Sequence, residues 1–372
     1  MNIFILTQPL GHNFGGILQN YALQQVLIKK GFSPSTIITS PIICSSIADS
    51  IKLFLKRTIF HFKYGKMLKE IEKESPVEQK LRNFSESFII RTKCFNNLHS
   101  INSFFQKQKK DCCIIVGSDQ VWRPKYSPCL PLFFCASESL KTIPHFAYAA
   151  SFGVDYCEFS KKQKQLAKAY LPFFKAVSVR ENNAIDLCRE NFDYDKAIAV
   201  PDPTLLLHAD DYRKLFDETE KKGLTCYFLD YTEQKKRIAE RFSIDNDGMA
   251  INALLPLLPQ DEVLKQKKEM CSIPDWLSGL ANAKYVMTDS FHGTVFSILF
   301  HRQFIVTTTQ ERGNARIRDL LDDFGLSERL VSFDDYDSAK KTLETPVDYD
   351  AVEQKLAILR EKGMSFLNEN LR

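Results

Sequence analysis

The stretch DWLSGLANAKYVMTDSFHGTVFSILFHRQFIV, Asp275–Val306, decides the fold. The apolar residues before its polar corner have strand length, over Tyr285–Thr288, and the apolar run after it has helix length. The corner, Ser290–Thr294, should therefore lie where a strand passes into a helix N-terminus, and unpaired backbone N–H groups and the helix dipole attract anions there. His292 in this corner can donate or accept a proton near neutral pH. The alternative is that the hydroxyl residues are helix caps and His292 is a buried, hydrogen-bonded side chain.

Length and composition limit the possibilities. The chain has 372 residues, which is long enough for two domains with separate cores. A hydrophobic content of 44% and a charged content of 26% are typical of soluble globular proteins. The net charge of +4 is small for this length and speaks against nucleic acid as a partner. The ten cysteines include one adjacent pair and no CxxC motif, so a reducing cytoplasm is favoured over a disulfide framework or a zinc site.

Two features bear on membranes. The N-terminus has no basic lead-in and too short an apolar run for a signal peptide, and no uncharged apolar run approaches the roughly 20 residues of a membrane span. Residues 51–69 contain bulky apolar side chains and six basic residues with no acidic residue. Such a helix can lie on the anionic inner face of the cell membrane. The alternative is an ordinary surface helix with a solvated face.

The first half reads as an α/β unit. Asn2–Thr7 is a strand with an almost continuous apolar run, followed by the glycine-bearing loop Gly11–Gly16 and a helix over Ile17–Lys30. The loop matches neither GxGxxG nor a P-loop, so it does not indicate a dinucleotide or nucleoside triphosphate. Its glycines would let the backbone approach a ligand closely, and the alternative is an ordinary tight turn.

A second buried strand, Cys112–Val116, is followed by the loop Gly117–Trp122. Ligands of open α/β sheets bind beyond the carboxyl ends of the strands. We therefore expect Asp119 and Gln120 to bind hydroxyls and Trp122 to stack on a sugar face.

The second half restarts the strand–helix alternation. A strand over Ala176–Val179 leads to Arg180, which can grip a carboxylate or phosphate with two parallel hydrogen bonds; the alternative is a salt bridge to Glu181 or another neighbour. The next strand ends at Pro201–Thr204, where two prolines fix the loop and aim Asp202.

This alternation predicts three parts. Residues 1–172 and 173–345 each form a Rossmann-like domain with a parallel sheet. Residues 346–372 form a terminal helix that can pack back on the first domain.

Seven motifs occur in an order that resembles the polysaccharide pyruvyl transferase family: NFGGILQNYAL (Asn13–Leu23), GSDQVW (Gly117–Trp122), YAASFG (Tyr148–Gly153), SVRE (Ser178–Glu181), PDPTLLL (Pro201–Leu207), SFHGT (Ser290–Thr294) and NARIRDLL (Asn314–Leu321). Each motif is modest, but the series spans nearly the whole chain. The resemblance implies a glycosyltransferase-B-like pair of Rossmann-type domains facing a central cleft. It also implies transfer of pyruvate from a donor, phosphoenolpyruvate, to two hydroxyls of a sugar acceptor, which gives a cyclic ketal on a surface polysaccharide or its lipid-linked precursor. We expect residues 1–172 to bind the acceptor and residues 173–345 to bind the donor.

The residue chemistry suits this reaction, which requires no redox cofactor and for which we expect no metal. The donor carries a carboxylate and a phosphate, so its pocket needs cations and helix N-termini. We assign proton transfer to His292 and Asp119, donor binding to Arg180, Ser290, Gly293 and Arg316, and acceptor binding to Asn13, Gly15, Gln19, Gln120, Trp122 and Asp202. We further expect Arg180 and His292 to share one anion pocket.

The sequence departs from the family at one position. Some similar members carry Arg two residues before the histidine, where this chain has Ser290, so Arg312 or Arg316 would have to supply the guanidinium. Two other functions remain open. One is a sugar-nucleotide-dependent glycosyltransferase of the same architecture, because fold alone does not separate the two chemistries. The other is a non-catalytic protein of an envelope-assembly complex.

Overall fold

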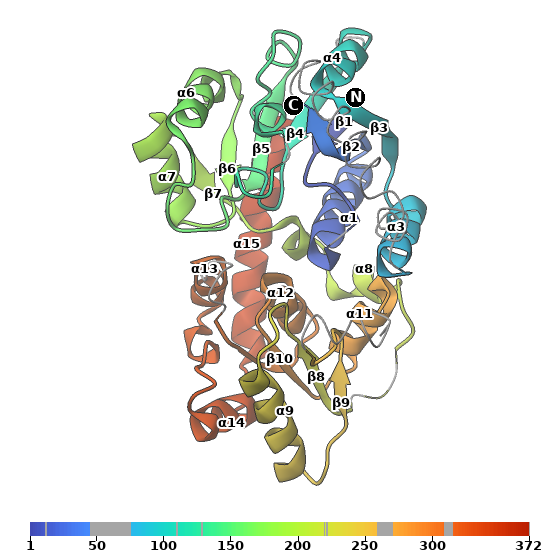
Figure 1. Cartoon of the computed structure of the whole chain (residues 1–372), viewed down its shortest axis with the longest axis vertical. Coiled ribbons are helices and arrows are strands. Elements are labelled where there is room, and N and C mark those ends of the chain that lie inside the picture. The colour runs from blue at the N-terminus through green and yellow to red at the C-terminus, as the bar shows by residue number, and fades with distance from the viewer. Residues whose placement is uncertain are drawn as a thin grey trace, which may run out of the picture. The chain divides into compact units, whose positions relative to one another are not determined.

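The computed structural model describes residues 1–11, 13–44, 76–108, 111–127, 129–218, 220, 222–258, 271–308 and 315–371. They fold into two compact units. The first comprises Met1–Pro203 and Gly363–Arg372, and the second comprises Thr204–Lys362. Each unit is described separately, with the element labels of Figure 1.

Strands and helices alternate through the first unit. Its elements are β1 (Asn2–Leu6), α1 (Phe14–Lys29), β2 (Ser33–Cys44), α3 (Pro76–Phe88), β3 (Arg91–Asn97), α4 (Leu98–Gln106), β4 (Cys112–Val116), α5 (Leu130–Phe133), β5 (His145–Ala150), α6 (Lys161–Tyr170), η1 (Leu171–Phe173), β6 (Val177–Val179), α7 (Asn183–Phe192) and β7 (Ile198–Ala199). A short 3-10 helix, η2 (Pro203–Leu206), follows at the unit boundary.

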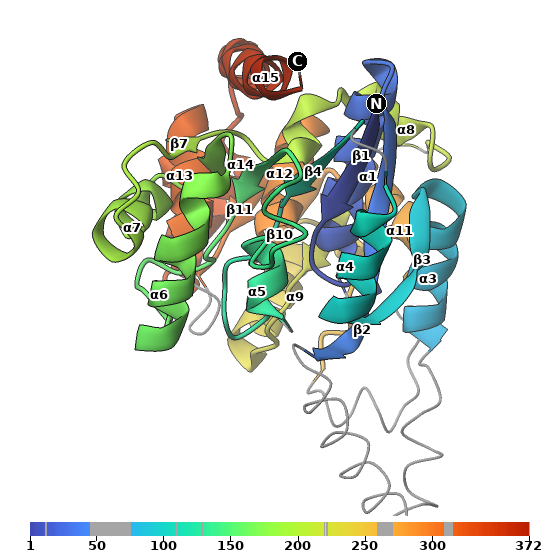
Figure 2. The same cartoon turned by 90° about the horizontal axis from the view of Figure 1, so that it is seen from above.

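The strands of the first unit form one parallel sheet. Among the described residues its order is β3-β2-β1-β4-β5-β6-β7, so the winding direction reverses between β1 and β4. Helices α3 and α4 lie toward the β3 edge, and α6 and α7 toward the β7 edge (Figures 1 and 2). All residues of β4 and β5 are buried, as expected for central strands that are covered on both faces. This order is that of a doubly wound sheet, and in such sheets ligands bind beyond the carboxyl ends of the strands beside the reversal, here β1 and β4.

The second unit is smaller and follows the same alternation. Its elements are α8 (Ala209–Arg213), β8 (Leu224–Tyr227), α9 (Glu233–Asp245), β9 (Ile251–Ala253), α11 (Ile273–Ala281), β10 (Tyr285–Thr288), α12 (Phe291–Leu299), β11 (Gln303–Val306), α13 (Ala315–Phe324), η3 (Ser327–Arg329), α14 (Tyr336–Glu344) and α15 (Tyr349–Asn370).

The second sheet is also parallel. In the part of the unit that the structure describes, its order is β11-β10-β8-β9, so the reversal lies between β8 and β10. The predicted strand Tyr285–Thr288 is β10, and the helix predicted after the polar corner is α12. The corner therefore lies beside the reversal point of this sheet.

The boundary between the units differs from the predicted one. The prediction placed it at 172/173, whereas the first unit extends to Pro203. Strands β6 and β7 extend the first sheet beyond β5, because Val177 pairs with Ala147 and Ile198 pairs with Ser178. Consequently Arg180 and Asp202 belong to the first unit.

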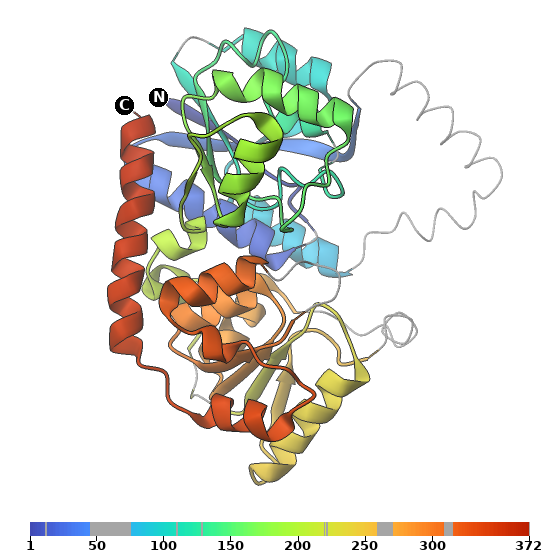
Figure 3. The same ribbon diagram turned by 90° about the vertical axis from the view of Figure 1, so that its left-hand side faces the viewer.

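The terminal helix α15, red in Figure 3, contributes to both units: its residues through Lys362 belong to the second unit and Gly363–Arg372 to the first. Within the first unit, the Phe366 ring packs edge-on against the Phe146 ring, with centroids 6.0 Å apart. Lys30 donates a hydrogen bond to the side-chain oxygen of Asn368. The end of the helix is thus tied to both the sheet and α1.

No helix in the described ranges has the length and apolar character required to cross a bilayer. The proposed basic membrane-surface segment, residues 51–69, lies outside the described residues.

Arg302 joins the ends of two helices in the second unit. It follows α12 and is 4% exposed. Its Nε donates to the Phe300 carbonyl oxygen at 2.6 Å, and its Nη1 donates to the Ala283 carbonyl oxygen, just after α11, at 3.1 Å. A cation at these two C-terminal ends satisfies carbonyl groups that have no partner inside the helices and opposes the negative ends of the dipoles.

We therefore predict that Arg302→Met lowers the free energy of unfolding by about 2–3 kcal/mol, because buried carbonyls lose a charged donor. Urea unfolding followed by circular dichroism measures this. The exposed Arg237, changed to Met, is the matched control and should cost less than about 0.5 kcal/mol. Equal losses in the two variants would contradict the capping role.

Candidate functional site

In the first unit, Gln19 ties together the two loops that follow β1 and β4. Its Nε2 donates to Thr7 Oγ1 at 2.9 Å and to the Gly16 carbonyl at 2.8 Å, while its Oε1 accepts from the Ser118 backbone N–H at 3.2 Å. Gln19 is fully buried. Its contacts are those of a loop connector, and they hold together the two loops at the sheet reversal.

Helix α1 begins beside these loops, at the same sheet reversal. Asn13 is its N-cap, with the side-chain oxygen accepting from the Gly15 N–H at 3.0 Å. Gly16 allows a close approach here, because a Cβ at this position would lie 3.3 Å from Asp119 Oδ2. Glycine at 16 therefore lets the carboxylate of the β4 loop lie against the start of α1.

The loop after β4 turns sharply beneath this helix. Gly117 has φ +121°, and a Cβ there would lie 2.3 Å from the Tyr148 carbonyl oxygen, so only glycine fits. Asp119 adopts a left-handed conformation, φ +66°, and its N–H donates to Ser118 Oγ at 2.6 Å. This turn directs the Asp119 carboxylate toward the end of β6.

Arg180 lies at the end of β6 between two carboxylates. Its Nη2 is 3.1 Å from Asp119 Oδ1, and its Nη1 is 3.1 Å from Asp202 Oδ2. Ser118 Oγ donates to the same Asp202 oxygen at 3.2 Å. All three charged side chains are at most 6% exposed. Burial acts to lower the pKa of Arg180, but Asp202, Asp119 and Glu181 outweigh it and raise that pKa, so the guanidinium stays charged.

This arrangement changes the role expected of Arg180. We predicted that Arg180 grips a donor anion, but an anion approaching it would meet Asp119 and Asp202, whose combined charge exceeds that of one guanidinium. The geometry instead makes Arg180 the cation that orients two carboxylates. Carboxylate oxygens accept hydrogen bonds from hydroxyl groups, so the cluster suits a polyhydroxylated ligand.

Glu181, the next residue, holds the loop after β5. Its Oε1 accepts from Ser151 Oγ at 2.9 Å and from the Phe152 and Gly153 backbone N–H groups at 2.8 and 3.2 Å. The SVRE and YAASFG motifs thus meet through a buried carboxylate.

The other two residues predicted in the β4 loop have structural contacts. Trp122 is fully buried, stacks on Phe134 with an interplanar angle of 8°, and donates from Nε1 to the Phe133 carbonyl at 3.0 Å. The expectation that it stacks on a sugar does not fit this placement, because both its ring and its N–H are used in the core. Gln120 accepts from Arg123 Nη1 at 3.1 Å and remains partly exposed.

In the second unit, the predicted polar corner forms the start of α12 beside the reversal between β8 and β10. Ser290 is the N-cap, and its Oγ accepts from the Gly293 N–H at 3.3 Å. Glycine is needed at 293, because a Cβ would lie 2.4 Å from Thr288 Oγ1. The close packing brings the helix start against the end of β10, and its N-terminal N–H groups and dipole favour an anion.

His292 is the second residue of this helix. It is 6% exposed, and the Phe291 ring packs edge-on against the imidazole with centroids 5.1 Å apart. Arg316, in the first turn of α13, has its guanidinium carbon 5.8 Å from the Phe291 ring centroid. An imidazole, a guanidinium and a helix N-terminus therefore gather around Phe291.

The sequence analysis missed one charged residue near this corner. Lys235, on α9, forms a buried ion pair with Asp289, the residue before the N-cap, with Nζ and Oδ2 2.7 Å apart. Asp289 could have been identified from the sequence, because it directly follows a predicted buried strand. No local pattern identifies Lys235, because it lies 54 positions away in the chain.

The predicted site residues fall into two groups. The first unit holds Asn13, Gly15, Gln19, Asp119, Gln120, Trp122, Arg180 and Asp202, and the second unit holds Ser290, His292, Gly293 and Arg316. Arg312 lies outside the described residues. Because Arg180 and His292 belong to different units, their sharing of one anion pocket stays a prediction.

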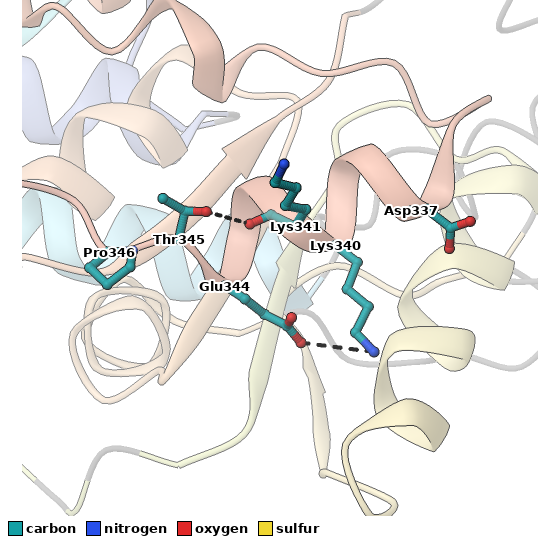
Figure 4. Close-up of a pocket in the computed structure, with 6 residues that line it drawn as sticks. All are labelled: Asp337, Lys340, Lys341, Glu344, Thr345 and Pro346. Atoms are coloured by element: carbon teal, nitrogen blue, oxygen red, sulfur yellow. Dashed lines mark hydrogen bonds and ion pairs between the residues drawn. The ribbon is translucent and has the colours of Figure 1, made fainter.

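A separate hollow of the second unit holds none of these residues. It lies along α14 and is lined by Asp337, Lys340, Lys341, Glu344, Thr345 and Pro346 (Figure 4). Lys340 and Glu344 are paired across one helical turn at 4.0 Å, and Thr345 Oγ1 donates to the Lys341 carbonyl at 2.7 Å. These are the contacts of an ordinary helix surface.

The buried cluster around Arg180 generates a stability prediction. Arg180→Met should lower the free energy of unfolding by about 3–5 kcal/mol, because it leaves two buried carboxylates without their cation. Adding Asp202→Asn should recover part of this loss by removing one uncompensated charge. Urea unfolding measures both variants.

The control is Arg189→Met, since Arg189 forms an exposed ion pair with Asp186. That variant should change the free energy of unfolding by less than about 0.5 kcal/mol. If Arg180→Met were equally mild, the guanidinium would not be the group that holds the two aspartates.

Solved structures with a similar architecture are known. The glycotransferase of kitacinnamycin is 9% identical with a TM-score of 0.54, and the alignment covers 100% of this chain and 99% of that one. The N-terminal domain of Candida albicans trehalose-6-phosphate phosphatase is 10% identical with a TM-score of 0.53, covering 100% and 96%. TarM is 11% identical with a TM-score of 0.50, covering 100% and 98%. Identities this low show the fold alone, which is glycosyltransferase-B-like with two parallel sheets.

The family is shown by the sequence itself. No curated protein matches the chain. The family model described as polysaccharide pyruvyl transferase matches residues 13–311, which include the first six motifs in full and both groups of predicted site residues apart from Arg316. The chain therefore belongs to the polysaccharide pyruvyl transferase family.

Proposed function

We propose that this protein transfers pyruvate from phosphoenolpyruvate to two hydroxyls of a sugar, forming a cyclic ketal on a surface polysaccharide or its lipid-linked precursor. The observation that carries the proposal is the electrostatic contrast between the two units. The reversal point of the second sheet has a helix N-terminus, an imidazole and a guanidinium, whereas that of the first sheet has a carboxylate-rich cluster. The reaction has one polyanionic substrate and one polyhydroxylated substrate, and each matches one of these environments.

The donor is assigned to the second unit. Phosphoenolpyruvate carries a phosphate and a carboxylate, both of which are stabilised by N–H groups at a helix start. Ser290 and Gly293 shape the first turn of α12, and the Arg316 guanidinium near Phe291 supplies positive charge. Arg316 takes the role of the arginine that some members of the family carry at the position of Ser290.

The acceptor is assigned to the first unit. Asp119 offers a carboxylate oxygen to a sugar hydroxyl, and Arg180, held in place by the fully buried Asp202, fixes the direction of that carboxylate. Asn13 and Gly15 lie at the start of α1, and Gln120 lies in the loop after β4. We assign Asp119 the role of general base, because a carboxylate can take the proton of an attacking hydroxyl.

The chemistry then proceeds in two steps. His292 donates a proton to the methylene carbon of phosphoenolpyruvate, which becomes a methyl group, and the oxocarbenium-like C2 is attacked by one sugar hydroxyl. Next, a second hydroxyl attacks C2 and the C2–O bond to phosphate breaks. The two hydroxyl protons balance the reaction, since one replaces the proton that His292 gave and the other leaves with phosphate. Positioned acid–base groups of this kind contribute about 10²–10⁴-fold.

The first prediction of this scheme concerns His292. Incubation of the protein with phosphoenolpyruvate and a galactose-containing acceptor should release phosphate, and His292→Gln should lower kcat roughly a hundredfold or more because the proton donor is lost. His301→Gln is the control, since His301 is exposed and pairs with Glu353. Turnover only with a sugar nucleotide would favour the rival glycosyltransferase activity, and full activity of His292→Gln would contradict the assigned role.

The second prediction concerns Arg316. Arg316→Gln should raise KM for phosphoenolpyruvate about tenfold, with a smaller effect on kcat, because a cation that binds the ground-state anion is removed. The exposed Arg318, two residues further along the same helix, is the matched control when changed to Gln. Steady-state kinetics at a fixed acceptor concentration gives kcat and KM for both variants. An unchanged KM in Arg316→Gln would remove Arg316 from the donor site.

A further inference from the structure

The buried ion pair between Lys235 and Asp289 crosses the reversal point of the second sheet. Asp289 follows β10 and precedes the N-cap of α12, and its side chain is fully buried. Lys235 lies in the first turn of α9, the helix that follows β8. The pair therefore joins the two strand–helix turns on either side of the sheet reversal.

The Asp289 carboxylate is hydrogen-bonded on both oxygens. Oδ1 accepts from the Leu229 backbone N–H at 2.6 Å, and Oδ2 accepts from the Asp230 backbone N–H at 3.1 Å and from Lys235 Nζ at 2.7 Å. The loop after β8 is thus fastened to the turn that carries His292. With both oxygens engaged from one side, the carboxylate cannot rotate without breaking hydrogen bonds.

The lysine is held equally closely. Its ammonium group also donates to the Asp230 carbonyl at 2.8 Å and lies 5.5 Å from the Phe228 ring centroid. Its side chain is 8% exposed. Burying an ammonium group has a desolvation cost of several kcal/mol, and well-packed apolar residues often stabilise a fold as well as a buried ion pair does. The ion pair also fixes the orientation of the loop after β8 relative to the start of α12, because it is bonded to both.

We propose that Lys235 and Asp289 are a positioning pair for His292, an inference that rests on the proposed function. By fixing the residue three positions before His292, the pair sets the first turn of α12 and with it the orientation of the imidazole. Neither residue touches the donor in this scheme. Loss of the pair should therefore impair proton transfer more than donor binding.

The experiment uses Lys235→Met, which keeps the apolar stem and removes the charge. We expect kcat to fall about tenfold or more while KM for phosphoenolpyruvate stays within about twofold. Lys235→Arg should restore part of kcat, because a guanidinium can again pair with Asp289. The control for a purely structural effect is Leu343→Ala, since Leu343 is a fully buried core residue on α14 of the same unit.

A second readout does not depend on turnover. The imidazole ¹⁵N–¹H signals of His292, identified by their loss in His292→Gln, should shift in Lys235→Met and stay in place in Leu343→Ala. If the native protein released no phosphate from phosphoenolpyruvate, the proposed function would fail and these signals alone would decide the positioning role. Unmoved His292 signals, or a kcat loss that only follows the folded fraction as in Leu343→Ala, would overturn the inference.

Discussion

Buried charge at the carboxyl ends of parallel strands is the constraint on which the rest of this structure depends. In the first unit, one guanidinium joins the loops after β4, β6 and β7, because Arg180 lies 3.1 Å from both Asp119 and Asp202. In the second unit, Asp289 and Lys235 join the turns after β10 and β8. Charges removed from water destabilise a fold unless they are paired and hydrogen-bonded. Each unit therefore keeps the loops at its sheet reversal in one arrangement, or loses much of its stability.

The two units use this constraint to different ends. The cluster around Arg180 has more negative than positive charge, so it suits hydroxyl groups better than phosphate. The start of α12 carries His292 in its first turn, with Arg316 near Phe291, so the positive end of its dipole and the nearby guanidinium suit an anion. Arg180 had the residue type of an anion site, but its neighbours give it another role. The proposed reaction uses both environments, one for its anionic donor and one for its polyhydroxylated acceptor.

Much of this organisation could be predicted from the sequence. Apolar runs of strand length located β1, β4 and β10, the polar corner after β10 located the start of α12, and the motifs led to the family. The boundary between the units was predicted at the wrong residues. An apolar run indicates that a strand is buried but does not indicate which sheet the strand joins, so β6 and β7 were assigned to the wrong unit. Trp122 was misread because the turn at Gly117–Asp119 decides which way the next side chains point. Lys235 stayed hidden because its partner lies 54 positions away.

The fold alone does not select the reaction, since two-sheet proteins with related architecture include glycosyltransferases. The reaction can be identified by following the C2 carbon of phosphoenolpyruvate into the products. The protein should be incubated with phosphoenolpyruvate labelled with ¹³C at C2 and a galactose-containing acceptor, and the products followed by NMR. Our account predicts that the label enters a quaternary ketal carbon bonded to two sugar oxygens, with one phosphate released per ketal. Label that stays in phosphoenolpyruvate, or leaves as free pyruvate with no sugar adduct, would contradict it.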